Sequence, residues 1–304
     1  MLFCLAVLLI ALGGATPAWA GDSPAGFWWG SDSSGPNPSG SASPCPTSSA
    51  PWDEPNVSNS GCGRYGGYVG EVGGYWTTLS CSGFVSHWDS SGASDAVANL
   101  NAGSGKGLGA YWFAGGPGMD PSYNGTTSEA YAWGKRQADG AENAAGNTNS
   151  NITVIWMDVE DGGGNAGWNE QMTPGSCSHV QSTSACCSAS VDRATINGFI
   201  DEIWNKGILF PGVYSSVSQW SSILGTGTSS NMTNIMEWTS IFGGNCTQPG
   251  PTSWSQGSGS CSSHSASFFG GVTTSGNCAV EWQWAGNSSG DYDQIDGNRY
   301  LLCE

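Results

Sequence analysis

Short apolar runs recur along the chain and alternate with segments of helical periodicity. Several of these runs place β-branched or aromatic residues at consecutive positions, as strands that are buried on both faces do. The strands predicted in this way cover residues 25–32, 64–72, 107–117, the first part of 152–163, 207–214, 234–242 and 279–286. The long connections follow strands, and they cover residues 33–60, 161–190 and 243–266.

The clearest helix begins near Asp192, its expected N-cap, and ends at Gly207, a typical C-terminal stop. Its apolar residues recur three and four positions apart, as they do along one face of a helix. That predicted face consists of Ile196, Phe199, Ile200, Ile203 and Trp204. We expect further helices over residues 94–102, 128–145 and 216–224.

This order of elements predicts an α/β fold. Strands that alternate with helices are typical of parallel sheets joined by crossover helices. About eight strands in about 280 residues favour closure into a TIM-like (β/α) barrel, complete or modified, over an open sheet. We therefore expect one barrel domain over residues 21–304, with long loops after its strands.

The first twenty residues are typical of a signal peptide. They form an apolar run that ends in Ala18-Trp19-Ala20, so we expect cleavage after Ala20 and secretion, with an uncleaved anchor as the alternative. Cleavage would remove Cys4 and leave ten of the eleven cysteines. An even number in an exported chain predicts up to five disulfides that staple the loops.

Composition excludes several classes of function. The net charge is −17 with seven basic residues, which argues against nucleic acid and anionic membranes as partners. No C-x-x-C pair is present and the chain has three histidines, so we expect no zinc site. The stretch GSGKG at residues 103–107 lacks the spacing of a phosphate loop, and no dinucleotide fingerprint follows a strand, so we expect no cofactor.

Three carboxylates follow the strand of residues 152–163, at Asp158, Glu160 and Asp161. Side chains two apart in a strand share a face, so Asp158 and Glu160 should both project into the mouth of the barrel. Carboxylates this close do not easily ionise together, and we expect the pKa of one to be raised. Such a pair suits the cleavage of a glycosidic bond. A Ca²⁺ site and a solvated strand end are the alternatives.

Aromatic side chains that stack on sugars are expected to line the same mouth. The chain has sixteen tryptophans, and each of them could instead fill the core. The aromatic residues near the predicted strand ends are Trp29, Trp112, Tyr214, Trp238 and Trp284.

Five motifs in order resemble those of glycoside hydrolase family 25, the lysozyme-type muramidases with a modified (β/α) barrel, or of a related glycoside-hydrolase-like barrel family. The resemblance spans most of the chain after residue 20. Its motifs are GFWWGSDSS, GLGAYWFA, WMDVED, FPGVYSS, and EWQWAG followed by YDQIDGNRY.

The resemblance implies a secreted hydrolase of β-linked amino-sugar polymers, with peptidoglycan as the expected substrate. It implies that Glu160 is the general acid and that Asp158 supports it, by steadying a substrate-assisted intermediate or positioning a water. Asp32 and Asp296 would shape the floor of the site, and Tyr214 would lie at the sugar-binding cleft. Weaker substrate contacts are implied for Tyr111, Trp238 and Gln283. The alternative is a non-catalytic carbohydrate-binding or cell-surface protein on the same scaffold.

Overall fold

The structure is a computed structural model. It describes thirteen segments of the 304-residue chain. They are residues 27–33, 65–74, 108–120, 122–148, 152, 154–161, 166–168, 171–173, 178–181, 188–225, 236–240, 278–287 and 290–296. The predicted signal peptide and the predicted helix over 94–102 lie outside these residues. So do all the cysteines except Cys278, whose side chain is not described, and the predicted disulfides therefore stay a prediction.

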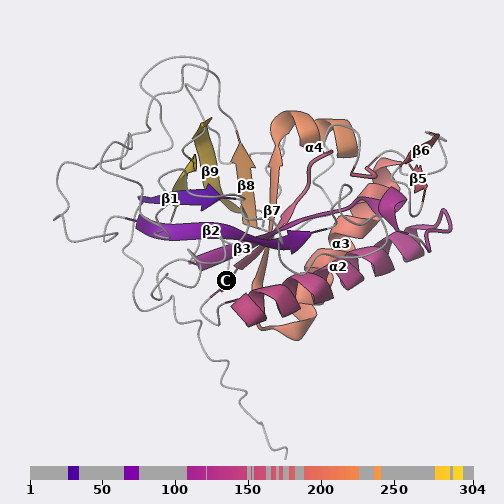
Figure 1. Ribbon diagram of the computed structural model, residues 1–304, viewed down its shortest axis with the longest axis horizontal. Coiled ribbons are helices and arrows are strands. Elements are labelled where there is room, and N and C mark those ends of the chain that lie inside the picture. The colour runs from indigo at the N-terminus through magenta and orange to yellow at the C-terminus, as the bar shows by residue number, and fades with distance from the viewer. Residues whose placement is uncertain are drawn as a thin grey trace, which may run out of the picture.

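Eight strands form the main sheet (Figure 1). Their bounds are β1 (Phe27–Ser33), β2 (Tyr65–Gly74), β3 (Leu108–Phe113), β4 (Val154–Asp158), β7 (Phe210–Ser216), β8 (Met236–Ser240), β9 (Cys278–Asn287) and β10 (Gly290–Asp296). A separate two-stranded sheet pairs β5 (Gln171–Thr173) with β6 (Ser178–Gln181). The helical elements are η2 (Pro117–Met119), α2 (Thr127–Thr148), α3 (Ala189–Lys206) and α4 (Val217–Leu224).

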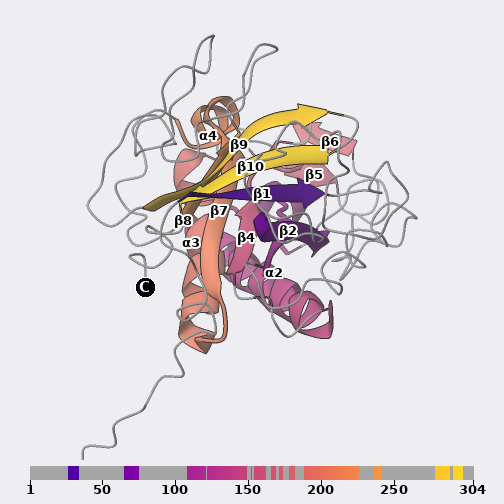
Figure 2. The same cartoon turned by 90° about the vertical axis from the view of Figure 1, so that its left-hand side faces the viewer.

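Strands β2, β3, β4, β7 and β8 pair in parallel and form the central sheet. Strand β9 continues it in parallel beside β8, and β10 lies antiparallel between β9 and β1. Because β1 also pairs in parallel with β2, the order of strands returns to its start as a closed barrel (Figure 2). The predicted α/β class and the predicted parallel strands are confirmed. The barrel is modified by the antiparallel strand β10, which the apolar pattern did not predict.

Two groups of apolar side chains pack on opposite faces of the barrel wall. The inner group consists of Val69, Tyr111, Val154, Trp156, Met236 and Trp238. The outer group lies between the strands and the helices and includes Ile155, Met157 and Val159. Residues of β4 alternate between the two groups, and this is why its sequence is apolar at nearly every position.

A glycine makes room for the largest inner side chain. Gly212 of β7 lies opposite Trp156 in the register of the two strands. A Cβ atom at this position would lie 2.2 Å from Cε3 of the indole ring, closer than carbon atoms approach. The inside of the barrel is therefore filled by side chains, as in other barrels of this size.

Helices α2 and α3 lie side by side on the outer face (Figure 1). Glycines bring their backbones together, because a Cβ atom on Gly134 would lie 1.9 Å from Thr195 O and one on Gly198 would lie 2.0 Å from Tyr131 O. Ion pairs join the two helices at their surface, between Lys135 and Glu202 and between Lys206 and the carboxylates of Asp139 and Glu142.

The predicted ends of α3 are partly correct. Gly207 is confirmed as its C-cap, with φ of 64° and an N–H group that donates to Ile203 O. The predicted N-cap Asp192 is wrong, because the helix begins at Ala189 with Ser188 as N-cap and Asp192 is buried in the first turn.

Two tryptophans lie elsewhere than predicted. Trp204, expected on the buried face of α3, is 38% exposed and packs edge-on against Phe210, with ring centroids 5.9 Å apart. Trp112, expected at the barrel mouth, alternates with the inner Tyr111 and is buried in the outer group. No helix in the described ranges combines the length and the apolar content needed to cross a membrane.

Candidate active site

Asp158 is the last residue of β4, and its side chain is 6% exposed. It follows the inner residues Val154 and Trp156 at the spacing of two that keeps side chains on one face. The backbone of Val159 continues the pairing, since its N–H group donates to Tyr214 O at 2.9 Å. Glu160 is half-buried and lies two residues beyond the end of β4, and its place on the face of Asp158 stays a prediction.

The segment after Glu160 is anchored to its neighbours. The N–H group of Asp161 donates to Gln219 Oε1 of α4 at 3.3 Å, and its carbonyl oxygen accepts from Ala166 N at 3.1 Å. Ala166 in turn accepts through its carbonyl oxygen from Gly116 N at 2.7 Å. The loops that follow β3 and β4 are therefore connected at the carboxyl ends of these strands.

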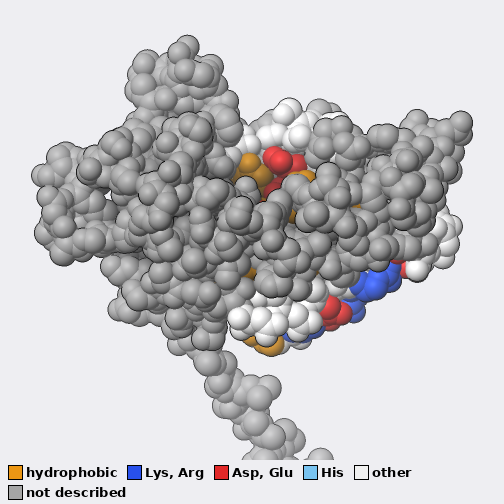
Figure 3. All heavy atoms as spheres, in the orientation of Figure 1, with side chains coloured by type: hydrophobic (Ala, Val, Ile, Leu, Met, Phe, Trp, Pro, Cys, Tyr) orange, Lys and Arg blue, Asp and Glu red, His pale blue; other side chains and the backbone are white. Residues whose placement is uncertain are grey.

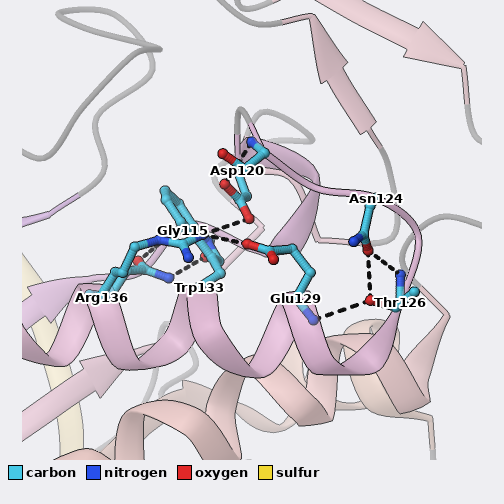
Figure 4. Close-up of polar contacts among 9 residues, drawn as sticks. Gly115, Asp120, Asn124, Thr126, Glu129, Trp133 and Arg136 are labelled. Atoms are coloured by element: carbon cyan, nitrogen blue, oxygen red, sulfur yellow. Dashed lines mark hydrogen bonds and ion pairs between the residues drawn. The ribbon is translucent and has the colours of Figure 1, made fainter.

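Helix α2 fixes the loop after β3. The side-chain amide of Gln137 makes two hydrogen bonds of 2.8 Å, accepting from the N–H group of Gly115 and donating to its carbonyl oxygen. Trp133 Nε1 donates to the same oxygen at 2.9 Å (Figure 4). Arg136 bonds Asp120 at 2.8 Å and Glu129 at 3.0 Å, and these contacts extend the attachment to the end of the loop.

Beside Asp158, the predicted substrate-binding residue Tyr214 contacts two others, Trp238 and Gln283. Tyr214 lies opposite Asp158 in the strand register, and its ring centroid is 4.3 Å from that of Trp238. The Tyr214 hydroxyl donates to Gln283 Oε1 at 2.8 Å. Trp238 itself is 2% exposed and packs against Tyr214, and a direct contact of Trp238 with a sugar stays a prediction.

Tyr111 also touches the ring of Trp238, edge-on, with centroids 6.4 Å apart. Its hydroxyl donates to Glu71 Oε2 of β2 at 3.1 Å. Glu71 is 1% exposed, and its Oε1 makes no hydrogen bond to another described residue. Burial raises the pKa of Glu71 well above its ordinary value, and the hydrogen bond from Tyr111 opposes this only in part. Glu71 is therefore a second inner carboxyl group, and it favours the neutral form.

Sequence reasoning missed Glu71 and two further buried acids, Glu237 and Glu281. Glu281 of β9 lies opposite Trp238 in the register, whereas Glu237 precedes Trp238 on β8. The sequence did carry a signal, because each of the three acids interrupts an apolar or glycine-rich strand. Two of them, Glu237 and Glu281, are each followed directly by a tryptophan. Figure 3 shows acidic side chains, bordered by apolar ones, in a recess near the point where β7 leads into α4.

The backbone positions of the two remaining predicted acids are described, but their side chains are not. Asp32 lies in β1 opposite Val69 and Asp291, and Asp296 ends β10 opposite Phe27. Their predicted place at the floor of the site stays a prediction. Within the described residues, no group of three His, Cys, Asp or Glu side chains is arranged to hold a metal ion.

No protein-family model and no curated protein sequence matches this chain. Solved structures do resemble it. The spore cortex lytic enzyme SleM of Clostridium perfringens has a TM-score of 0.44 and 13% identity over 77% of this chain and 60% of SleM. A family GH25 lysozyme from Aspergillus fumigatus has a TM-score of 0.36 and 16% identity, over 64% of this chain and 71% of that one.

The modular autolysin LytC of Streptococcus pneumoniae, solved with a synthetic peptidoglycan ligand, has a TM-score of 0.45 and 14% identity. The match covers 88% of this chain and 46% of LytC. This chain thus spans less than two thirds of the length of SleM and of LytC. The Aspergillus lysozyme belongs to glycoside hydrolase family 25, the family whose motifs this sequence resembles. At these scores and identities, the activity has to follow from the side chains of this chain.

Proposed function

We propose that this protein is a secreted glycoside hydrolase of the muramidase type, which cleaves β-linked amino-sugar polymers and peptidoglycan in particular. One observation carries the proposal. Asp158 and Glu160 are two residues apart at the carboxyl end of β4, and the residue between them is hydrogen-bonded to β7. Ends of parallel strands are where barrels of this kind place their catalytic groups.

The two acids have environments that suit different roles. Glu160 is half-buried, so its carboxyl group can reach a bound polymer and give a proton to the leaving glycosidic oxygen. Asp158 is almost fully buried beside it, and its carboxylate would steady the positive charge that develops on the sugar or orient a water. The strong negative charge of the chain leaves nucleic acid and anionic membranes outside the proposal.

Tyr214 supplies the proposed wall for a sugar ring. Its ring is partly exposed, packs on Trp238 and has its hydroxyl oriented by Gln283. An aromatic face fixed in this way offers stacking to the C–H face of a sugar at little cost in side-chain entropy. The stack would place the glycosidic bond next to Asp158, because Tyr214 lies opposite that residue in the register.

The test is the release of reducing sugar ends from purified cell walls by the mature protein. Glu160→Gln keeps the shape of the side chain but removes its acidic proton, and we expect the rate to fall by about 10²- to 10⁴-fold. Asp161→Asn is the matched control, since it changes the next carboxylate along the chain and should leave the rate within a few-fold. Thermal unfolding checks that all three proteins are folded. Equal rates for the wild type and Glu160→Gln would refute the assignment.

A further inference from the structure

The residue between the two acids has its carbonyl group bonded to a side chain. Ser215 Oγ of β7 donates to Val159 O at 2.8 Å. The N–H group of Val159 donates to the carbonyl oxygen of Tyr214, which precedes Ser215 in the same strand. Two consecutive residues of β7 therefore hold both backbone polar groups of Val159.

The surroundings of Ser215 favour this hydrogen bond. Its side chain is 0% exposed, and a hydroxyl group has one proton to donate. Among the described residues, a second acceptor for this hydroxyl is Ser216 O, which lies farther away at 3.2 Å. A hydrogen bond shielded from water is stronger than an exposed one, and a buried carbonyl left without a donor costs about 1–3 kcal/mol.

The peptide that carries Glu160 is anchored on both sides. Val159 is fixed by Tyr214 and Ser215, and the N–H group of Asp161 bonds Gln219 of α4. The peptide groups on both sides of Glu160 are therefore held by hydrogen bonds, and its side chain rotates about a backbone that is fixed in place. A displacement of about 1 Å at a reacting group is enough to lower a rate about a hundredfold.

We propose that Ser215 is a positioning residue for Glu160, acting through the carbonyl group of Val159. The proposal rests on the function proposed above, because it assigns Ser215 a part in placing the proton donor. Ser215 itself points away from the inner face, since it alternates with the inner Tyr214, and it touches no substrate in this scheme.

The test compares Ser215→Ala with a matched loss of a hydrogen bond in the same wall of the barrel. Thr239 is also 0% exposed, and its hydroxyl donates to a different backbone carbonyl, Ser215 O, at 2.9 Å. Ser215→Ala should lower kcat about tenfold to a hundredfold with KM changed less than about twofold. Thr239→Val should cost similar stability but leave kcat within about twofold. Ser215→Thr retains the hydroxyl and should recover kcat.

A second measurement does not depend on activity. Amide hydrogen exchange at Glu160 and Asp161 should become about tenfold faster in Ser215→Ala, but not in Thr239→Val, because only the first change releases the peptide at Val159. Unchanged kcat in Ser215→Ala, or an equal loss of kcat in Thr239→Val, would overturn the positioning role.

The two proposals fail in different ways. If the wild type releases no reducing ends from cell walls, the proposed function fails, and hydrogen exchange then decides the placement of Glu160 by itself. Faster exchange in Ser215→Ala alone supports the anchoring of Glu160 through Val159, and unchanged exchange overturns it.

Discussion

The contact between α2 and α3 predicts that one methyl group added at Gly134 will disturb both stability and the candidate site. A Cβ atom there would lie 1.9 Å from Thr195 O and 2.8 Å from Phe199 N. Both neighbours are backbone atoms of α3, so no side chain can turn away. Ordinary contact begins at 3.4 Å, and the two helices would have to separate by about 1.5 Å at this point.

The expected magnitude follows from two opposing effects. Alanine is the better helix former by about 1 kcal/mol, whereas overpacking of a close contact costs about 1–3 kcal/mol and sometimes more. Because backbone must move against backbone, we expect the cost of overpacking to lie at the upper end of this range, about 3 kcal/mol, so Gly134→Ala should lower the free energy of unfolding by about 2 kcal/mol. The melting temperature should then fall on the order of 5 °C.

Gly146 supplies the matched control in the same helix. A Cβ atom on Gly146 would meet nothing within 4 Å, so Gly146→Ala should stabilise the protein by up to about 1 kcal/mol. Urea unfolding followed by tryptophan fluorescence measures both variants. Gly134→Ala as stable as the wild type would refute the close approach of the helices. An equal loss in both variants would show that the contact is not the cause.

The same substitution should reach the candidate site. Trp133 and Gln137 flank Gly134 on α2, and their side chains hold Gly115 in the loop after β3. A shift of α2 would move that loop, which is bonded through Gly116 to the segment that follows the two acids. We therefore expect Gly134→Ala to lower the release of reducing ends and Gly146→Ala to leave it unchanged.

Three further predictions concern single side chains. Burial raises the pKa of Glu71, so its contribution to stability is fully present below the unfolded-state value of about 4.5 and is lost as the pH rises towards the folded-state pKa. Glu71→Gln should match the wild type near pH 4 in urea unfolding and exceed it at pH 7, and parallel pH profiles would contradict this. Gly207→Ala forces a side chain into the left-handed region and should lower the free energy of unfolding by about 1 kcal/mol in thermal melts, whereas no loss would show that the cap is unstrained. Tyr214→Phe keeps the ring on Trp238 but removes the bond to Gln283, so polymer binding in a pull-down assay should weaken less than in Tyr214→Ala. Equal binding by the two variants would exclude stacking.

Local pattern predicted the strands well where burial on both faces left a continuous apolar run. Strand β4 is the best example, because its residues alternate between two apolar groups and neither face admits polar side chains until Asp158. The pattern was weaker where burial is partial. Strand β10, with the sequence GDYDQID, was missed because it carries three acids and little apolar periodicity. Its place is set by pairing with β1 and β9 on either side.

The two ends of α3 differ in the same way, because one was predicted correctly from the sequence and the other was not. Gly207 was predicted as the end of α3 because glycine alone adopts the left-handed cap without strain. The start was misplaced because Ser188 and Asp192 are both suitable N-cap residues. The helix begins directly after Ser188, and its first turn buries Val191 and Asp192.

The sequence by itself determined the order of most strands and helices, the α/β class and the spacing of Asp158 and Glu160. These follow from periodicity and from chemistry within a few residues of the chain. Only the tertiary structure decided that Glu71 and Glu281 share the barrel with Asp158, that Ser215 holds Val159 and that Trp112 faces the helices instead of the mouth. The physical reason is that burial and hydrogen bonding between strands depend on which segments become neighbours when the barrel closes, and residues as far apart in the chain as Phe27 and Asp296 meet there.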